Sequence, residues 1–223
     1  MNKNILIVAA HADDELLGCG GTIARHVEEG NHVSIIFVAD GVTSRIATCS
    51  NEIHVRNQVA RDALAVLGVE DIYFLGMPDN KLDTFSLLDV VQSLEKIIFK
   101  ISPEIIYTHH FGDLNIDHQI VYRAVMTACR PVPGISVRKI LCFEVMSSTD
   151  WSFNTFEIFS PDVFVNIEKY WELKKNALKL YADEMRKYPH SRSLQHIESL
   201  SRYRGASVGL ERAEAFKLVR WIK

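Results

Sequence analysis

The stretch "NILIVAAHADDE", residues 4–15, changes abruptly from an apolar run to a histidine and three consecutive acids. A short, uniformly apolar run rich in β-branched residues predicts a strand that is covered on both faces. In open α/β sheets, ligands bind beyond the carboxyl ends of the strands, and His11, Asp13 and Asp14 fall at that position. Because adjacent carboxylates repel one another, their clustering indicates a functional site rather than a contribution to stability.

Four further apolar runs resemble the first one, and segments with helical periodicity separate them. The runs are residues 32–40, 71–77, 104–110 and 139–145. The helical segments are residues 54–67, ended by Gly68, and 85–100, with Asp83 or Thr84 as the N-cap. This alternation predicts an α/β fold, a Rossmann-like three-layer sandwich with a mostly parallel sheet and right-handed crossovers.

The C-terminal third has a different pattern. Residues 171–188 read as a charged amphipathic helix, and residues 193–205 read as another helix that Gly205 ends. The sequence shows no internal repeat and no Pro/Gly-rich linker. We therefore expect one domain over residues 1–223, with an α/β core at 1–150 and a helical C-terminal extension at 151–223 that lines the site.

The composition limits the classes of partner. The chain has 223 residues and a formal net charge of −3, so it has no electrostatic basis for binding nucleic acid or an anionic membrane surface. No window approaches the ~18 uncharged apolar residues of a membrane helix. Four widely spaced cysteines and the lack of an export signal predict reduced thiols. We expect a soluble, cytoplasmic protein with a small-molecule partner, and the amphipathic C-terminal third suggests a homo-oligomer.

A second polar cluster follows the fourth predicted strand, in "HHFGDLNIDHQIVYRAV", residues 109–125. Asp113, Asn115, Asp117 and His118 lead into a helix, which Asn115 or Asp117 could simply cap. His118 lies in the first turn, where the helix dipole disfavours a protonated imidazole. A neutral imidazole is the form that binds a metal ion.

His11, Asp14 and His118 together form a set of two histidines and one carboxylate. Three such ligands and an open fourth position are typical of a catalytic zinc site, where bound water reaches a pKa of ~7. Asp13 could then take the proton from that water as general base and return it to a leaving amine. Each residue taken singly also fits an ordinary strand-end or capping role.

The segment "AAHADDELLGCGGTIARHVEEG" resembles the AHPDDE signature of the PIG-L/LmbE family of zinc-dependent de-N-acetylases. The resemblance continues through "RNQVARDALAVLGV", "FLGMPDNKLD", "DLNIDHQIVYRAV" and most of the C-terminal third. It implies that His11, Asp14 and His118 bind Zn²⁺, or another divalent metal such as Fe²⁺, and that Asp13 is the general base. It also implies hydrolysis of an N-acetyl group on an N-acetylglucosaminyl-type amino sugar.

Two positions depart from the family pattern. Ala12 replaces the proline of AHPDDE, which removes no functional group. Asn115 stands where many members have a histidine with an acid or oxyanion role, and an amide cannot shuttle a proton. Either Asp13 does both acid and base work, or another histidine substitutes. The candidates for that substitution are His109, His110 and His190.

The resemblance also suggests substrate contacts, each with an ordinary alternative. Arg56 matches an arginine that contacts substrate in relatives, or it is a solvated arginine at a helix start. Asp40 could bind sugar hydroxyls or form an Asp-Gly turn. His190 and Arg192 lie in "YPHSRS", which is near the active-site mouth in relatives or is simply a surface loop. Two further positions complete the expected site: Asn115 at the substrate and Asp117 behind the metal ligands. Trp151 belongs to the core or an interface, or it offers a face on which a sugar ring could stack.

Parts of the sequence are also compatible with other functions. A zinc amidase acting on another amide, such as a thiol conjugate, would use the same metal site. The segment "GCGG", residues 18–21, prompts a dinucleotide-binding reading, but it lacks the GxGxxG spacing and follows acids that would repel a pyrophosphate. A metal-binding protein without catalysis would have no use for Asp13. The sequence does not identify the molecule that carries the acetyl group.

Overall fold

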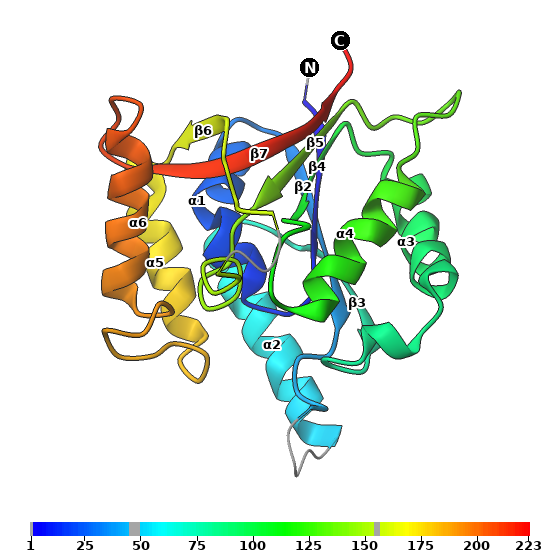
Figure 1. Ribbon diagram of the computed structural model, residues 1–223, viewed down its shortest axis with the longest axis horizontal. Coiled ribbons are helices and arrows are strands. Elements are labelled where there is room, and N and C mark those ends of the chain that lie inside the picture. The colour runs from blue at the N-terminus through cyan, green and yellow to red at the C-terminus, as the bar shows by residue number, and fades with distance from the viewer. Residues whose placement is uncertain (1, 45–49, 154–156) are drawn as a thin grey trace.

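The computed structural model describes residues 2–44, 50–153 and 157–223. These residues form a seven-stranded sheet of order β3-β2-β1-β4-β5-β7-β6 (Figure 1). Strands β1 to β5 are parallel, and β7 runs antiparallel between β5 and β6. The bounds are β1 Asn4–Ala9, β2 His32–Ala39, β3 Asp71–Met77, β4 Ile105–His109, β5 Lys139–Phe143, β6 Val163–Asn166 and β7 Ala213–Trp221. The predicted α/β fold with a mostly parallel sheet is confirmed.

Six α-helices in the described residues cover the two faces of the sheet. They are α1 Asp14–Glu28, α2 Ser50–Val66, α3 Leu87–Ile101, α4 Ile116–Ala128, α5 Trp171–Leu180 and α6 Leu194–Ala206. Helices α3 and α4 lie on one side of the sheet, and α1, α2, α5 and α6 lie on the other (Figure 1). None of these helices combines the length and apolarity that crossing a bilayer requires.

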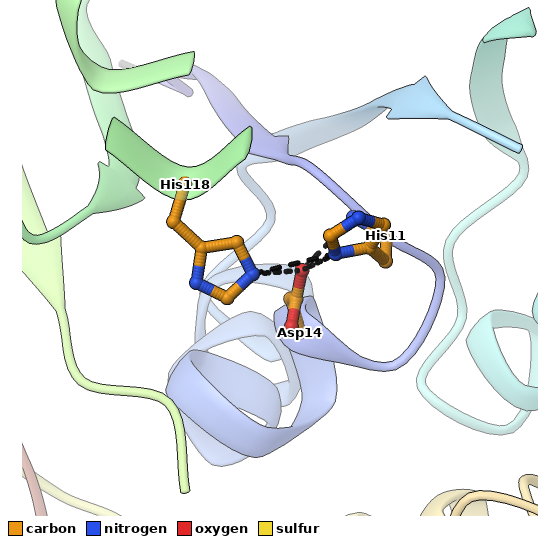
Figure 2. Close-up of side chains that lie close together, drawn as sticks. All are labelled: His11, Asp14 and His118. Carbon is orange, nitrogen blue, oxygen red and sulfur yellow. Dashed lines mark hydrogen bonds and ion pairs between the residues drawn. The ribbon is translucent and has the colours of Figure 1, made fainter. Parts of the chain in front are cut away.

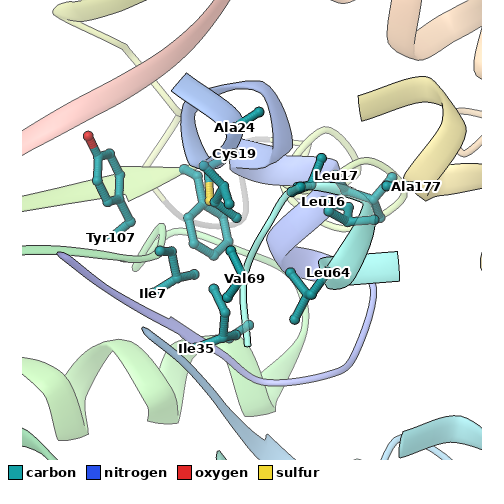
Figure 3. Close-up of a cluster of buried hydrophobic side chains, with 14 of the residues drawn as sticks. Ile7, Leu16, Leu17, Cys19, Ala24, Ile35, Leu64, Val69, Tyr107 and Ala177 are labelled. Carbon is teal, nitrogen blue, oxygen red and sulfur yellow. The ribbon is translucent and has the colours of Figure 1, made fainter. Parts of the chain in front are cut away.

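The central strand β1 is buried on both faces. Its residues Ile5 and Ile7 pack into the cluster beneath α1 and α2, whereas Leu6 and Val8 pack into the cluster beneath α3 and α4. Figure 3 shows part of the first cluster, in which α1 side chains meet side chains of the sheet. The uniformly apolar run of the sequence therefore reflects a strand between two helical layers.

Helix α1 packs unusually close to its neighbours. A Cβ on Gly18 would lie 2.4 Å from Phe143 Cδ2, and one on Gly21 would lie 2.7 Å from Ile167 Cβ. The helix is also interrupted at Cys19, whose φ is −147°. In the "GCGG" segment, Gly18 and Gly21 thus allow close packing inside a helix rather than forming a loop at its start.

A buried ion pair bridges the interruption in α1. The Glu214 carboxylate on β7 accepts the backbone N–H groups of Gly21 and Thr22 at 2.8 and 2.7 Å. Lys174 Nζ on α5 lies 2.7 Å from Glu214 Oε1 and donates to the Leu17 carbonyl at 3.0 Å. Backbone donors that the interruption would leave unpaired are therefore satisfied by the last strand.

Several element boundaries differ from the sequence predictions. The predicted helix 171–188 ends at Leu180, since residues 181–193 form turns and loop. Ser86 caps α3, because Asp83 and Thr84 belong to a preceding 3₁₀ turn. Gly205 does not end α6, which continues to Ala206.

Strands β6 and β7 were not predicted. The four residues of β6 are too few to give a pattern, and β7 mixes charged and apolar residues along "AEAFKLVRW". Cys19, Cys129 and Cys142 are buried free thiols, while Cys49 lies outside the described residues.

Candidate metal centre

The polar residues of the first and fourth strand ends meet at the point where the strand order reverses. Strands β1 and β4 are neighbours, and their connections leave in opposite directions along the sheet, to β2 and to β5. This is the position at which α/β sheets bind ligands. His11 and Asp14 come from the β1–α1 turn, and His118 comes from the first turn of α4 (Figure 2).

Three side-chain atoms of these residues form a nearly equilateral triangle. Asp14 Oδ2 lies 3.3 Å from His11 Nδ1 and 3.2 Å from His118 Nε2, and the two nitrogens are 3.3 Å apart. Ligands at 2.0–2.1 Å from a tetrahedral zinc ion are separated by about 3.3 Å. The three atoms therefore fit one face of a zinc coordination tetrahedron. All three residues are buried.

The remaining nitrogen of each histidine faces carboxylates. His118 Nδ1 lies 3.1 Å from Asp113 Oδ1. His11 Nε2 lies 3.0 Å from Asp79 Oδ1 and 3.1 Å from Asp117 Oδ2. Such carboxylates hold the proton on the outer nitrogen, so that the inner nitrogen keeps its lone pair for a metal ion.

The surrounding acids make this site attract positive charge. Burial lowers the pKa of His118, but Asp113 and Asp14 outweigh burial and raise it to about 9. Burial raises the pKa of Asp14, but the neighbouring imidazoles of His118 and His11 bring it well below its usual range. A cluster of carboxylates around two imidazoles thus suits a divalent cation, which would take the place of the imidazole protons.

Asp13 projects beside the triangle from a strained position. Its φ of 137° is rare for a residue with a side chain, and such strain costs about 1–3 kcal/mol. Its backbone N–H donates to Glu15 Oε2 at 2.9 Å. Arg192 Nη1 donates to Asp13 Oδ2 at 2.9 Å, whereas Arg56 Nη2 is 3.6 Å from Oδ1. Burial raises the pKa of Asp13, and the two guanidinium groups oppose that rise.

A cavity of about 180 Å³ opens over these groups. Its described lining residues are His11, Asp13, Gly41, Ser44, Arg56, Asp79, Asn80, Asn115, Glu184 and Arg192. Arg56, Asn115 and Arg192, which the sequence analysis assigned to substrate binding, line this cavity, and their roles at a substrate stay predictions. Asp117 Oδ2 lies 3.1 Å from His11 Nε2, on the side of the ring away from Asp14.

Asp40 and His190 lie outside the described lining. The Asp40 carboxylate accepts the backbone N–H groups of Val42 and Thr43 at 3.0 Å, which is the turn-forming alternative. His190 Nδ1 accepts the Arg192 N–H at 3.0 Å, and its ring lies 5.3 Å from that of Trp151. Roles for Asp40, His190 and Trp151 at a substrate stay predictions.

Two of the three histidines proposed to replace the family histidine, His109 and His110, are buried and lie outside the described cavity lining. His109 Nε2 accepts the Ala10 N–H at 2.8 Å, and its ring stacks on that of His118 at 3.9 Å. His110 contacts the Glu157 carbonyl at 2.9 Å. Asn115 itself caps α4 by accepting the Asp117 N–H at 2.8 Å. Among the described lining residues, His11 is the one histidine.

Sequence reasoning missed several neighbours of the site. Asp79 follows the third strand, so the strand-end argument could have found it. Asp113 was noted in the second cluster without its role as partner of His118. No local pattern pointed to Glu184 or to Tyr181, whose hydroxyl donates to Glu15 Oε1 at 2.8 Å.

The PIG-L family, described as GlcNAc-PI de-N-acetylase, has a sequence model that matches residues 6–129. The chain belongs to the PIG-L family. The "Uncharacterized deacetylase YaiS" of Escherichia coli K12 is 34% identical over 183 residues, which are 79% of this chain and 89% of that protein. Several solved structures share the fold of this PIG-L family chain.

The N,N'-diacetylchitobiose deacetylase of Pyrococcus horikoshii has a TM-score of 0.79 at 20% identity, covering 98% of this chain and 84% of its own. GalB of Pseudomonas putida KT2440, a 4-carboxy-2-hydroxymuconate hydratase, has a TM-score of 0.80 at 18% identity. The match covers 99% of this chain and 98% of GalB. One fold therefore supports both deacetylases and a hydratase, and the chemistry has to be argued from the site.

Proposed function

We propose that this PIG-L family chain is a zinc-dependent hydrolase that removes the N-acetyl group from an N-acetylglucosaminyl-type amino sugar or its conjugate. The observation that carries the proposal is the triangle of His11, Asp14 and His118 with the buried carboxylate of Asp13 beside it. The family description and the deacetylase relative from Escherichia coli support the same reaction class.

His11, Asp14 and His118 would hold the metal ion through two nitrogens and one oxygen. Zinc accepts this donor set, and Fe²⁺ is the alternative metal. When bound, the ion would acidify a water molecule and polarise the acetamide carbonyl. Asp113 behind His118, and Asp79 and Asp117 behind His11, would keep the imidazoles oriented.

Asp13 would carry the proton in both directions. Its Oδ1 is buried and has no hydrogen-bond partner among the described residues, so no protein donor would compete with the attacking water for this oxygen. The carboxylate takes one proton as the water oxygen bonds to the acetyl carbon, and it gives that proton to the sugar nitrogen as the C–N bond breaks. The products are acetate and a free amine, and the raised pKa of Asp13 suits such a proton carrier.

The cavity would bind the sugar through polar side chains. Asn80 and Asn115 offer amide groups, and Arg56 closes one wall, where it donates to the Ala12 carbonyl at 2.6 Å. We expect this arrangement to accept hydroxyl groups next to the acetamide. We also expect a cytoplasmic location, which cell fractionation would check. We expect a homo-oligomer as well, which light scattering of the purified protein would check.

The test is acetate release from a panel of N-acetylglucosamine derivatives, with metal content measured on the same preparation. Release that a chelator abolishes and added zinc restores is the expected result. One metal ion per chain without acetate release would contradict the deacetylase and leave two competitors. Amides with other acyl groups test the amidase alternative, and an unsaturated carboxylic acid tests a hydratase.

A further inference from the structure

In the segment after α5, residues 181–192, three side chains contact Asp13 or residues next to it. Tyr181 donates to Glu15, whose other oxygen accepts the Asp13 N–H. Glu184 pairs with Arg56, and Arg192 pairs with Asp13. The C-terminal third therefore contacts the β1–α1 turn directly at the residue that would move the proton.

Arg192 is held at two ends of its guanidinium group. Its Nη1 donates to Asp13 Oδ2 at 2.9 Å. Its Nε donates to Ser147 Oγ at 2.7 Å, in the loop that follows β5. A planar guanidinium fixed at two nitrogens has little freedom to rotate, so it can define the direction of the carboxylate it binds.

The two oxygens of Asp13 consequently have different surroundings. Oδ2 is bound by Arg192, whereas Oδ1 is buried without a hydrogen bond from any described residue. Arg56 Nη2, at 3.6 Å from Oδ1, is the nearest competing donor in an ion pair with Asp13. Without Arg192, the Asp13 carboxylate would be free to rotate towards Arg56. Oδ1 would then no longer be held in one direction.

We propose that Arg192 is a positioning residue, which binds Asp13 Oδ2 so that Oδ1 is the oxygen presented to the reacting water. This replaces the expectation that Arg192 binds substrate. The kinetic part of the inference rests on the proposed deacetylase function. Misplacing a catalytic group by about 1 Å can cost about 10²-fold in rate, so the effect of losing Arg192 should lie in that range.

The kinetic test compares zinc-loaded wild type, Arg192→Ala, Arg192→Lys and a matched control. Arg186 is in the same segment, is exposed, and donates to backbone carbonyls, so Arg186→Ala removes a nearby positive charge without touching Asp13. For Arg192→Ala we expect kcat to fall about 10²-fold while KM and zinc content stay unchanged. Millimolar guanidinium should restore part of kcat, and Arg192→Lys should keep more activity than Arg192→Ala. A raised KM with unchanged kcat would instead make Arg192 a substrate-binding residue and overturn the inference.

A structural readout separates this inference from the proposed function. Crystal structures of the zinc-loaded wild type and Arg192→Ala should show Asp13 in one conformation in the first and turned towards Arg56 in the second. If the wild type releases no acetate from any substrate, the proposed function fails, and an unchanged Asp13 in the variant still refutes positioning by Arg192. If Arg192→Ala does not fold, Ser147→Ala removes the second anchor alone and should show a smaller shift of the same kind.

Discussion

Replacing Asp113 by alanine is expected to weaken zinc binding more than replacing Asp79 by alanine. Among the described residues, His118 Nδ1 faces one carboxylate, Asp113, at 3.1 Å, and Ser148 Oγ at 3.3 Å. His11 Nε2 faces two carboxylates, so that Asp117 remains at 3.1 Å when Asp79 is removed. Asp113→Ala therefore leaves His118 Nδ1 without its carboxylate, whereas Asp79→Ala leaves His11 Nε2 with Asp117.

The magnitude follows from the kind of contact that is lost. A hydrogen bond to a charged group contributes about 1.5–3 kcal/mol, and losing an outer carboxylate typically costs 10–100-fold in metal affinity, about 1.4–2.7 kcal/mol. Asp113→Ala should fall in that range, because Asp113 is fully buried and is the carboxylate that the described structure places at His118 Nδ1. Asp79→Ala should cost less than about tenfold, because Asp79 borders the cavity and water can enter.

The assay is competition for zinc between the metal-free protein and a chromophoric chelator. Asp83→Ala removes an exposed acid from the 3₁₀ turn before α3 and serves as the matched control, with no expected change. Circular dichroism would verify that each variant is folded. Equal losses for Asp113→Ala and Asp79→Ala, or a larger loss for the second, would refute the assignment of the outer carboxylates.

Three further outcomes are expected. Asp13→Asn should retain zinc but lower kcat/KM by about 10²–10⁴-fold, the range for losing a general base; near-normal acetate release would exclude Asp13 from proton transfer. Burial lowers the pKa of His26 in the folded protein to about 4. As pH falls, the unfolded chain therefore takes up a proton at this histidine before the folded chain does. The free energy of unfolding should consequently drop by up to about 3 kcal/mol between pH 6.5 and 4. Urea denaturation of wild type and His26→Gln checks this, since the drop should shrink in the variant. Gly18→Ala should destabilise the fold by about 1–3 kcal/mol, because its Cβ would lie 2.4 Å from Phe143 Cδ2, and Phe143→Leu should relieve part of that loss in calorimetry.

The sequence predicted the parallel part of the sheet because strands β1, β2, β4 and β5 have nearly continuous buried runs. Strand β7 escaped because it mixes buried and partly exposed residues and because its partners are set by long-range pairing. Residues 181–188 continued a helical pattern beyond Leu180, yet the chain leaves the helix there, and Tyr181 and Glu184 bind Glu15 and Arg56. Tertiary contacts of this kind override local propensity.

In the candidate site, too, residues in local motifs could be predicted, whereas residues brought in by tertiary contacts could not. His11, Asp14 and His118 could be predicted from the sequence because two short motifs after strands contain them. The structure brings one nitrogen or oxygen atom of each close together. The residues that support them were harder to find, since Arg192 lies 179 positions from the Asp13 that it binds. No local pattern encodes a pairing over that distance, and the partner has to be found in three dimensions.

The bridge between Glu214 and the interrupted helix α1 bears on how small a working fragment of this protein can be. A fragment that ended after α4 would still contain His11, Asp14 and His118. It would leave the backbone donors of Gly21 and Thr22 without their carboxylate acceptor, 193 and 192 positions away. The residues that would bind the metal ion are therefore encoded in the first 118 positions, but the helix that presents Asp14 receives part of its backbone hydrogen bonding from the last strand.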